Sequence, residues 1–493
     1  MAGIGFELRR VLAKGGVARF LTVSLAGTAV VAGPWLLSVM GIFAIQNLSR
    51  SAIREAPALF SAVIVFCNSF SLILFGGPHY VFTRRLSDLI YQEKDREAGG
   101  ALLQFLALTA VCAVLVGVPC AAFLRAEGVS RPILFRFAVV ALFLTVNLNW
   151  VIMGFISLLK SYIGILLAYL GGSLISVAGT AFLGARCGAA GALLGYTAGQ
   201  LFTAVVLYGM SLARYAPLRM PWRPLADAFR RYRWLLLSGV FYTWAVWVDK
   251  VVAWFLMGSP AGGGWIRVYD PYDVPIFFAV LTLIPSLLYF TLETETSYFP
   301  ALQDFLRSLG KGSLAEIQTR KRMANAVMWN GLREQGILQA VCTVMLALVA
   351  PEIVRVLFAG QVDVTVLRTT LVAVFFHSLF LCLLIFLFYL EIHFKAFLSA
   401  LTFFLVNLAV SLAIGAAGAT GLLGGGYLLG AMAGSGAAVA FLARSAGRID
   451  RILFLRASHP DGSREEPPSA EAAHEAAAKR RVRRVPSAPT QGA

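Results

Sequence analysis

Long apolar runs with almost no charge dominate this sequence and leave few folds open to it. Runs of 18 or more mostly apolar residues recur about twelve times. A helix needs roughly 20 such residues to cross a bilayer core, and only structures that satisfy their own backbone hydrogen bonds are tolerated there. With 59% hydrophobic and 14% charged residues, the composition excludes an ordinary soluble protein. We therefore predict an all-α polytopic membrane protein with about twelve transmembrane helices.

The predicted spans form two sets of six, separated by a basic linker over residues 213–233. The N-terminal lobe, residues 18–212, contains the spans Ala18–Ile45, Ala58–Phe82, Ala101–Leu124, Ile133–Leu159, Tyr162–Ala185 and Ala189–Leu212. The C-terminal lobe, residues 234–443, contains the spans Trp234–Met257, Ile276–Phe299, Gly336–Phe358, Val366–Tyr389, Ala396–Ala417 and Gly421–Ala443. Two six-helix lobes joined by one linker are typical of a transporter built around a polar path.

The distribution of basic residues predicts that both termini face the cytoplasm. The net charge is +17, and with the N-terminus inside, the cytoplasmic segments hold 32 of the lysines and arginines whereas the outer loops hold eight. Segments rich in Lys and Arg remain on the cytoplasmic side of a membrane. The basic character therefore indicates topology and contact with anionic lipids, and we expect no nucleic-acid partner.

Three segments outside the spans carry further expectations. Residues 1–17 place apolar side chains on one helical face, which favours an interfacial amphipathic helix; a basic leader that only sets topology is the alternative. The cytoplasmic loop 300–335 has an apolar stripe and a possible capping box at Ser313, so we expect two interfacial helices there. The basic tail 444–493 is expected to be disordered and solvated, with lipid or partner contact as the alternative.

The sequence contains no recognisable catalytic or metal-binding motif. The six cysteines occur singly in or beside apolar runs, without the spacing of a metal site or a disulfide framework. Patterns such as G-x-S-x-G, H-E-x-x-H and the Walker loop are absent, and the lone D-x-x-D of Asp270 and Asp273 is typical of a turn. We therefore expect a protein that is not an enzyme and that uses no metal or cofactor.

The seventh span, Trp234–Met257, contains an acid and a base side by side, Asp249 and Lys250. A charge near the bilayer centre costs about 3 kcal/mol even on lenient scales, so such residues usually face a cavity or a partner. Adjacent helical residues point about 100° apart, so we expect these two side chains to meet different partners. The structural alternative is that both pair with other helices and serve only assembly.

These charges and the aromatic residues near them suggest a path for a polar substrate. Tyr242, Trp244, Trp247 and Trp254 would offer flat faces on which sugar rings could slide. Hydrogen bonds to hydroxyl groups would come from Asp249, Lys250, Glu293 and Glu295. Glu293 and Glu295 lie near the predicted cytoplasmic end of the eighth span, where a solvated mouth also explains them.

The end of the second span predicts a break or a kink in the helix. Gly76, Gly77 and Pro78 occur together there, and proline removes a helical hydrogen bond. His79 follows directly and is a candidate for proton coupling, although a kinked helix with an interfacial histidine explains it as well.

Three sequence motifs carry a resemblance to a known family. The opening MAGIGFELRR, the segment FGGPHYVFTRRLSDLIY at the end of the second span and LETETSYF at the end of the eighth resemble the PelG family. That family is the integral membrane component of the bacterial Pel exopolysaccharide system, and the similarity covers about the first eleven spans. The tail beyond Ala457 is outside it. The resemblance supplies no site residues, so the candidate path depends on the side chains themselves.

The resemblance implies a fold, a substrate and partners. It implies the multidrug/oligosaccharidyl-lipid/polysaccharide exporter fold, with two lobes around a central cavity, in the bacterial inner membrane. It also implies export of an N-acetylhexosamine polymer made by a cytosolic glycosyltransferase, with regulatory membrane subunits that respond to cyclic di-GMP. Two alternatives remain, a cation-coupled flippase for a lipid-linked oligosaccharide or a drug, and a scaffold that recruits the glycosyltransferase and transports nothing.

Overall fold

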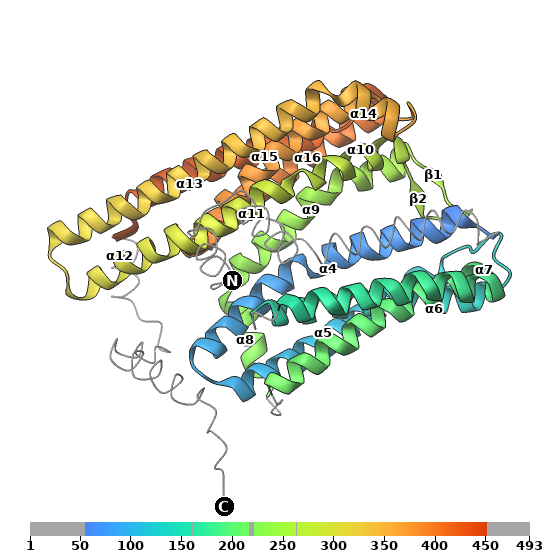
Figure 1. The fold of residues 1–493 in the computed structure, drawn as a ribbon, viewed down its shortest axis with the longest axis horizontal. Helices are drawn as coiled ribbons and strands as arrows, with labels where there is room; N and C mark the ends of the chain where they lie inside the picture. Colours follow the sequence, from blue (N-terminus) through green and yellow to red (C-terminus); the bar gives the residue numbers. More distant parts are fainter. Residues whose placement is uncertain (1–54, 159–161, 216–220, 263, 451–493) are drawn as a thin grey trace, which may run out of the picture. The chain divides into compact units, whose positions relative to one another are not determined.

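The computed structural model describes residues 55–158, 162–215, 221–262 and 264–450, and nearly all of them are helical (Figure 1). Among these residues, nine helices are long and apolar enough to cross a membrane, or ten if one bent pair counts as a single span. The predicted helical membrane fold is thereby confirmed. The expected interfacial helix 1–17, the first span Ala18–Ile45 and most of the tail 444–493 lie outside the described residues.

The chain divides into two compact units, residues 1–442 and 443–493, and the first contains both lobes. The described helices of the N-terminal lobe are α4 (Pro57–Tyr91), α5 (Asp95–Ala122), α6 (Pro132–Leu158) and α7 (Tyr162–Arg214). Figure 1 shows these helices side by side, with α6 packed on α4, α5 and α7.

Helix α7 comprises two antiparallel spans. Its backbone leaves helical geometry at Cys187 and Gly188, and Gly188 has a positive φ of 60°. Beyond this break the chain turns back, because a Cβ atom on Gly179 would lie 2.9 Å from the carbonyl oxygen of Gly195. Small residues permit such close packing in membranes. The fifth and sixth predicted spans are therefore both present.

A short helix, α8 (Arg223–Arg231), connects the lobes. The C-terminal lobe then contains α9 (Arg233–Leu256), the hairpin strands β1 (Ser259–Pro260) and β2 (Arg267–Val268), α10 (Asp270–Leu281), α11 (Leu283–Glu293), the π-helix η1 (Thr294–Tyr298), α12 (Phe299–Lys311), α13 (Leu314–Leu348), α14 (Ala350–Leu357), α15 (Val364–Tyr389), α16 (His393–Ala417), the 3-10 helix η2 (Thr420–Leu422) and α17 (Gly425–Ala446). All eleven predicted spans that fall in the described part of the chain thus have helical counterparts.

The loop 300–335 differs from the expectation of two separate helices. Its central break is correct, because α12 ends at Lys311 and the Ser313 side chain accepts a hydrogen bond from the Glu316 amide at the start of α13. However, α12 follows η1 directly, and α13 continues without interruption through Gly336 into the ninth span. That span then bends by 63° between α13 and α14. The loop is therefore an extension of two membrane helices.

The second span is not broken at its predicted position. Helix α4 runs without interruption from Pro57 to Tyr91, with Pro78 inside it. The neighbouring glycines have a different use, because they bring α4 against α9.

Candidate functional site

The two lobes meet where α4 crosses α9, and glycines on both helices allow the close approach. A Cβ atom on Gly76 would lie 1.9 Å from Thr243 Oγ1, and one on Gly77 would lie 2.4 Å from Val240 Cγ2. A Cβ atom on Gly239 would lie 2.6 Å from the carbonyl oxygen of Gly76. Only the smallest residues let helix backbones come this close. The paired glycines that predicted a helix break therefore form the junction of the lobes.

A polar cluster joins the lobes toward the C-terminal end of α4, and we call it the polar latch. Arg84 Nη2 lies 2.7 Å from Glu391 Oε1, in the turn after α15, and Arg84 Nε lies 3.4 Å from Asp88 Oδ1. The Tyr232 hydroxyl, just before α9, donates a 2.8 Å hydrogen bond to Asp88 Oδ2. Burial and the Asp88 carboxylate raise the pKa of Tyr232, so this hydroxyl keeps the proton that it donates.

Aromatic contacts join the lobes on the other side of the crossing. Phe66 of α4 stacks on Trp254 of α9, with ring centroids 4.7 Å apart. The Trp254 indole donates to both carboxylate oxygens of Asp273, at 2.9 and 2.7 Å. Trp265, between the two strands, donates a 3.3 Å bond to the Cys120 carbonyl of α5. The lobes are thus in contact on both sides of the glycine crossing.

Asp249 and Lys250 are both buried and pair with each other. Lys250 Nζ lies 3.1 Å from Asp249 Oδ2 and also donates a 2.7 Å bond to the Val246 carbonyl, one turn earlier in α9. The two residues have different further partners, as expected, but they also pair with each other, which their positions on the helix did not predict. The flexible lysine side chain folds back along its own helix, so that the 100° between adjacent positions does not separate the two charges.

Side chains from three other helices surround this ion pair. The Tyr272 hydroxyl of α10 donates to Asp249 Oδ2, and Asn407 Nδ2 of α16 lies 3.4 Å from Asp249 Oδ1. Asn407 also donates a 2.8 Å bond to the Ala245 carbonyl of α9. Lys250 Nζ lies 4.5 Å from the ring centroid of Tyr427 in α17, within range of a cation–π contact. The pair is therefore satisfied by hydrogen bonds and charge inside the C-terminal lobe.

A buried histidine extends this network. The hydroxyls of Tyr427 and Tyr242 lie 2.7 and 3.0 Å from the two ring nitrogens of His377 in α15. Buried ionisable groups in a membrane are usually satisfied in this way, because an unpaired one is costly. The network links Tyr242, His377, Tyr427, Lys250, Asp249 and Tyr272 across the four helices α9, α10, α15 and α17.

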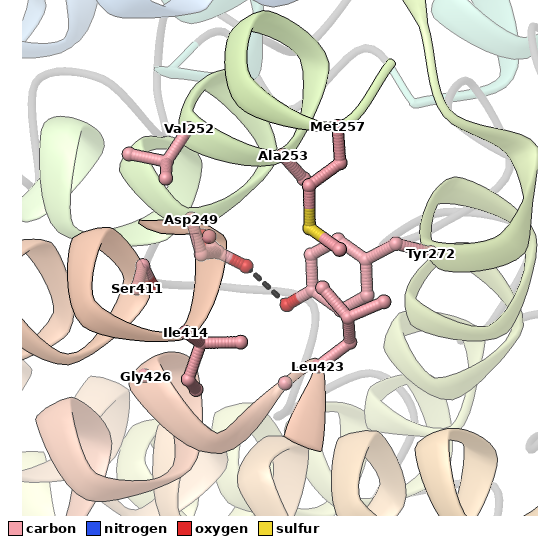
Figure 2. Close-up of a pocket in the computed structure, with 11 residues that line it drawn as sticks. Asp249, Val252, Ala253, Met257, Tyr272, Ser411, Ile414, Leu423 and Gly426 are labelled. Carbon is pink, nitrogen blue, oxygen red and sulfur yellow. Dashed lines mark hydrogen bonds between the residues drawn. The ribbon is translucent and has the colours of Figure 1, made fainter. Parts of the chain in front are cut away.

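A small cavity adjoins the network at Asp249. Its volume is about 10 Å³, close to the minimum that holds one water molecule. Figure 2 shows the Asp249 carboxylate and the Tyr272 hydroxyl facing each other at its edge, with Ser411 and Gly426 also in the lining. A cavity of this size has no room for a sugar ring.

The predicted aromatic residues have different surroundings. Trp254 is 1% exposed, so both of its faces are covered and it offers no open face to a sugar in this structure. Trp247 is half-buried, with its ring centroid 6.4 Å from that of Trp254 and 5.7 Å from Lys250 Nζ. Trp247, Lys250 and Trp254 thus lie along one face of α9. Trp244 and Tyr242 are also half-buried.

The remaining predicted residues lie on other helices. Glu293, at the end of α11, is half-buried beside Gly331 of α13, and Glu295 is buried in η1. His79 packs on α6, where a Cβ atom on Gly154 would lie 2.4 Å from His79 Cε1. The structure brings Asp249, Lys250, Trp247, Trp254 and Tyr242 together. Their role as a substrate path stays a prediction.

Sequence reasoning missed several residues of the site. Nothing in the sequence distinguishes Tyr427 and Tyr272 from the many other aromatic residues of the chain. His377 does carry one, because it is an ionisable residue within an apolar span. Asp273 was assigned to a turn, whereas it lies in the first turn of α10 and accepts bonds from Trp254 and from the Tyr269 amide.

The fold is similar to that of several solved transporters. A MATE transporter in the straight conformation superposes with a TM-score of 0.58 at 13% identity, covering 87% of this chain and 96% of that one. A MOP superfamily transporter from Pyrococcus furiosus gives 0.55 at 14% identity, with 86% and 95% covered. The lipid II flippase MurJ, in an inward closed conformation, gives 0.52 at 11% identity, with 88% and 92% covered. Similarity at this level of identity concerns the fold alone.

Comparison with sequence families identifies the chain more closely. No curated protein sequence matches it. The family model PelG, described as "Putative exopolysaccharide Exporter (EPS-E)", matches residues 1–454 and so extends over both lobes. The chain therefore belongs to the PelG family.

Proposed function

We propose that this protein exports an N-acetylhexosamine-rich exopolysaccharide from the cytoplasm to the periplasm, through the bacterial inner membrane, for a biofilm matrix. The observation that carries the proposal is the PelG family match over residues 1–454, which includes every helix of the described fold. The exporter and flippase folds that the chain resembles support movement of a polysaccharide or a lipid-linked sugar.

The lobe junction supports a sugar substrate. Phe70, Trp150 and Trp247 are partly buried and pack against a core cluster that contains residues of both lobes. Flat aromatic faces stack on sugar rings, and neighbouring hydroxyl groups supply hydrogen bonds. The Trp150 indole already donates a 3.0 Å bond to the Ser71 hydroxyl, so a hydrogen-bonding edge is present beside the ring. A separation of the lobes at the glycine crossing would uncover these side chains.

The ion pair argues against the cation-coupled alternative. A coupling cation needs a carboxylate that lacks a positive partner in part of the cycle. Asp249 has Lys250 Nζ at 3.1 Å and two further donors, from Tyr272 and Asn407. We infer that the Lys250 ammonium group, rather than a bound cation, balances the charge of Asp249. We further infer that chain elongation by the synthase drives the polymer forward.

A cytosolic glycosyltransferase and regulatory membrane subunits are the proposed partners, with anionic lipids around the basic linker. Helix α8 suits lipid contact, because Leu225 and Ala228 are buried whereas Arg223, Arg230 and the 54%-exposed Trp222 are open. If the protein is only a scaffold, these basic surfaces are required, whereas the aromatic residues at the lobe junction are not.

The test measures where the polymer accumulates when the cognate synthase is expressed with variant exporters. Trp247→Ala should trap hexosamine polymer in the cytoplasm at normal protein levels, whereas Trp222→Ala in the linker should secrete normally. Secretion that survives Trp247→Ala but fails when Arg223 and Arg230 are neutralised would support the scaffold. Dependence of wild-type secretion on a sodium or proton gradient, with loss of secretion in Asp249→Asn at a normal level of folded protein, would support the cation-coupled flippase.

A further inference from the structure

The hairpin of α12 and α13 is too long to be contained in a membrane. Residues Asp270–Gly310 form one candidate span of 41 residues, and α13 adds 35 residues on the return. At 1.5 Å per residue these lengths are about 62 and 52 Å, against a hydrocarbon core of about 30 Å. Tilts of transmembrane helices reach about 40°, which shortens the longer one only to about 47 Å. Part of the pair must project from the bilayer.

The charges locate the projecting part. The half of α13 from Ile337 to Leu348 exposes apolar side chains typical of a lipid-facing surface. Toward the start of α13, the exposed charged residues begin at Glu334, which accepts a hydrogen bond from the Tyr289 hydroxyl. Leu314 lies 20 residues beyond Glu334, which is about 30 Å along a helix. Even at a 40° tilt, the start of α13 lies about 23 Å outside the hydrocarbon.

This part of the hairpin cannot lie flat on the membrane. Helix α13 is a single helix from Leu314 to Leu348 without a proline, so its first half continues in the direction of its membrane half. A helix bends sharply only at a proline, a bulge or an inserted group. Figure 1 shows α12 and α13 side by side up to the turn that joins them. Leu302 and Phe305 of α12 are buried, so the two helices support each other.

The end of the hairpin, residues 304–323, has an exposed surface that is basic and apolar. The segment contains five basic residues, three arginines and two lysines, but only two acidic ones, Asp304 and Glu316. All three arginines, Arg307, Arg320 and Arg322, are exposed. Between them the surface exposes three apolar side chains, Leu306, Leu314 and Met323, the second of them at 72%. Exposed apolar residues ringed by charge are typical of a protein-binding surface.

We propose that the end of this hairpin binds an acidic, partly apolar surface patch of the cytosolic glycosyltransferase that supplies the polymer. Charge complementarity selects an acidic partner. A lipid surface fits poorly, because its potential decays over a Debye length of about 8 Å, whereas Arg320 and Arg322 lie about 16 and 14 Å from the hydrocarbon even at a 40° tilt. The inference depends on the proposed function and on the cytoplasmic orientation that the basic loops predict.

The first experiment measures the depth of the hairpin in the membrane. A fluorophore is placed at position 314 or at position 345, where Met345 is exposed on the apolar half of the same helix, in proteoliposomes with lipid-borne quenchers. Position 345 should be quenched several-fold, and position 314 should be quenched less than 1.2-fold. Equal quenching at both positions would place the hairpin on the membrane and overturn the proposal.

The second experiment measures binding of the purified glycosyltransferase to the exporter in nanodiscs. Arg320→Glu/Arg322→Glu should weaken binding at least tenfold, whereas Arg223→Glu/Arg230→Glu on α8, with the same change of charge, should alter it less than twofold. Equal effects of both variants, or no binding by the wild type, would overturn the docking. Trp247→Ala should bind normally, so a failure of the export proposal would leave the binding result unchanged.

Discussion

Arg84 and Glu391 form a 2.7 Å ion pair between the C-terminal part of α4 and the turn after α15, and so join the two lobes. Both side chains are partly exposed, at 36% and 43%. Pairs of this kind contribute little to stability, typically less than about 1 kcal/mol, because solvent screens them. Breaking this contact between the lobes therefore costs little free energy.

Neutralising the latch should open it. Glu391→Gln removes the charge that holds Arg84, so the contact between the lobes should break more often. Tyr80 and Phe388 lie across the same junction with ring centroids 5.3 Å apart, which makes a cysteine pair at these positions, joined by a short bifunctional thiol reagent, a reporter. We expect cross-linking there to fall several-fold in Glu391→Gln. Glu352→Gln, in an exposed pair within α14, is the control and should leave it unchanged.

Enlarging the glycine crossing should separate the lobes. A Cβ atom in Gly239→Ala would lie 2.4 Å from Tyr80 Cδ2 and 2.9 Å from Gly77 Cα, and backbone cannot move away cheaply. Overpacking of this kind costs about 1–3 kcal/mol. We expect a lower unfolding temperature in detergent and reduced polymer secretion. The control is Gly209→Ala, whose added Cβ would have no atom within 4 Å, and it should keep the wild-type unfolding temperature and polymer secretion. Equal losses in the two variants would mean that the glycine crossing has no special role.

The Asp249–Lys250 pair should behave as one unit. Removing one member of a buried pair leaves an uncompensated charge and costs about 3–5 kcal/mol. Lys250→Met and Asp249→Asn should therefore each destabilise the protein strongly, whereas the double variant should be more stable than Lys250→Met alone. A double-mutant cycle from thermal unfolding gives the coupling. Additive effects would show that the two charges are solvated separately.

The hydrogen bond between Trp254 and Asp273 should matter more than the stacking of the same indole on Phe66. Trp254→Phe keeps an aromatic ring against Phe66 but removes the donor from a half-buried carboxylate, which costs about 1–3 kcal/mol. Asp273→Asn keeps an oxygen that can accept from the indole and should cost less. Unfolding of purified protein, followed by loss of its helical circular dichroism, distinguishes the two variants.

The sequence by itself determined the helical membrane fold, because an apolar run of 20 residues has few other stable states in lipid. It also determined the two sets of spans and the presence of a charged site in α9. Only the tertiary structure decided what the local signals meant. The glycines at 76 and 77 do not end a helix but allow α9 to pack closely against α4. Lys250 turns back to Asp249, and Tyr272, Asn407 and Tyr427 surround the pair. Periodicity specifies the face of a helix on which a residue lies, whereas the partner on that face depends on helices far away in the chain.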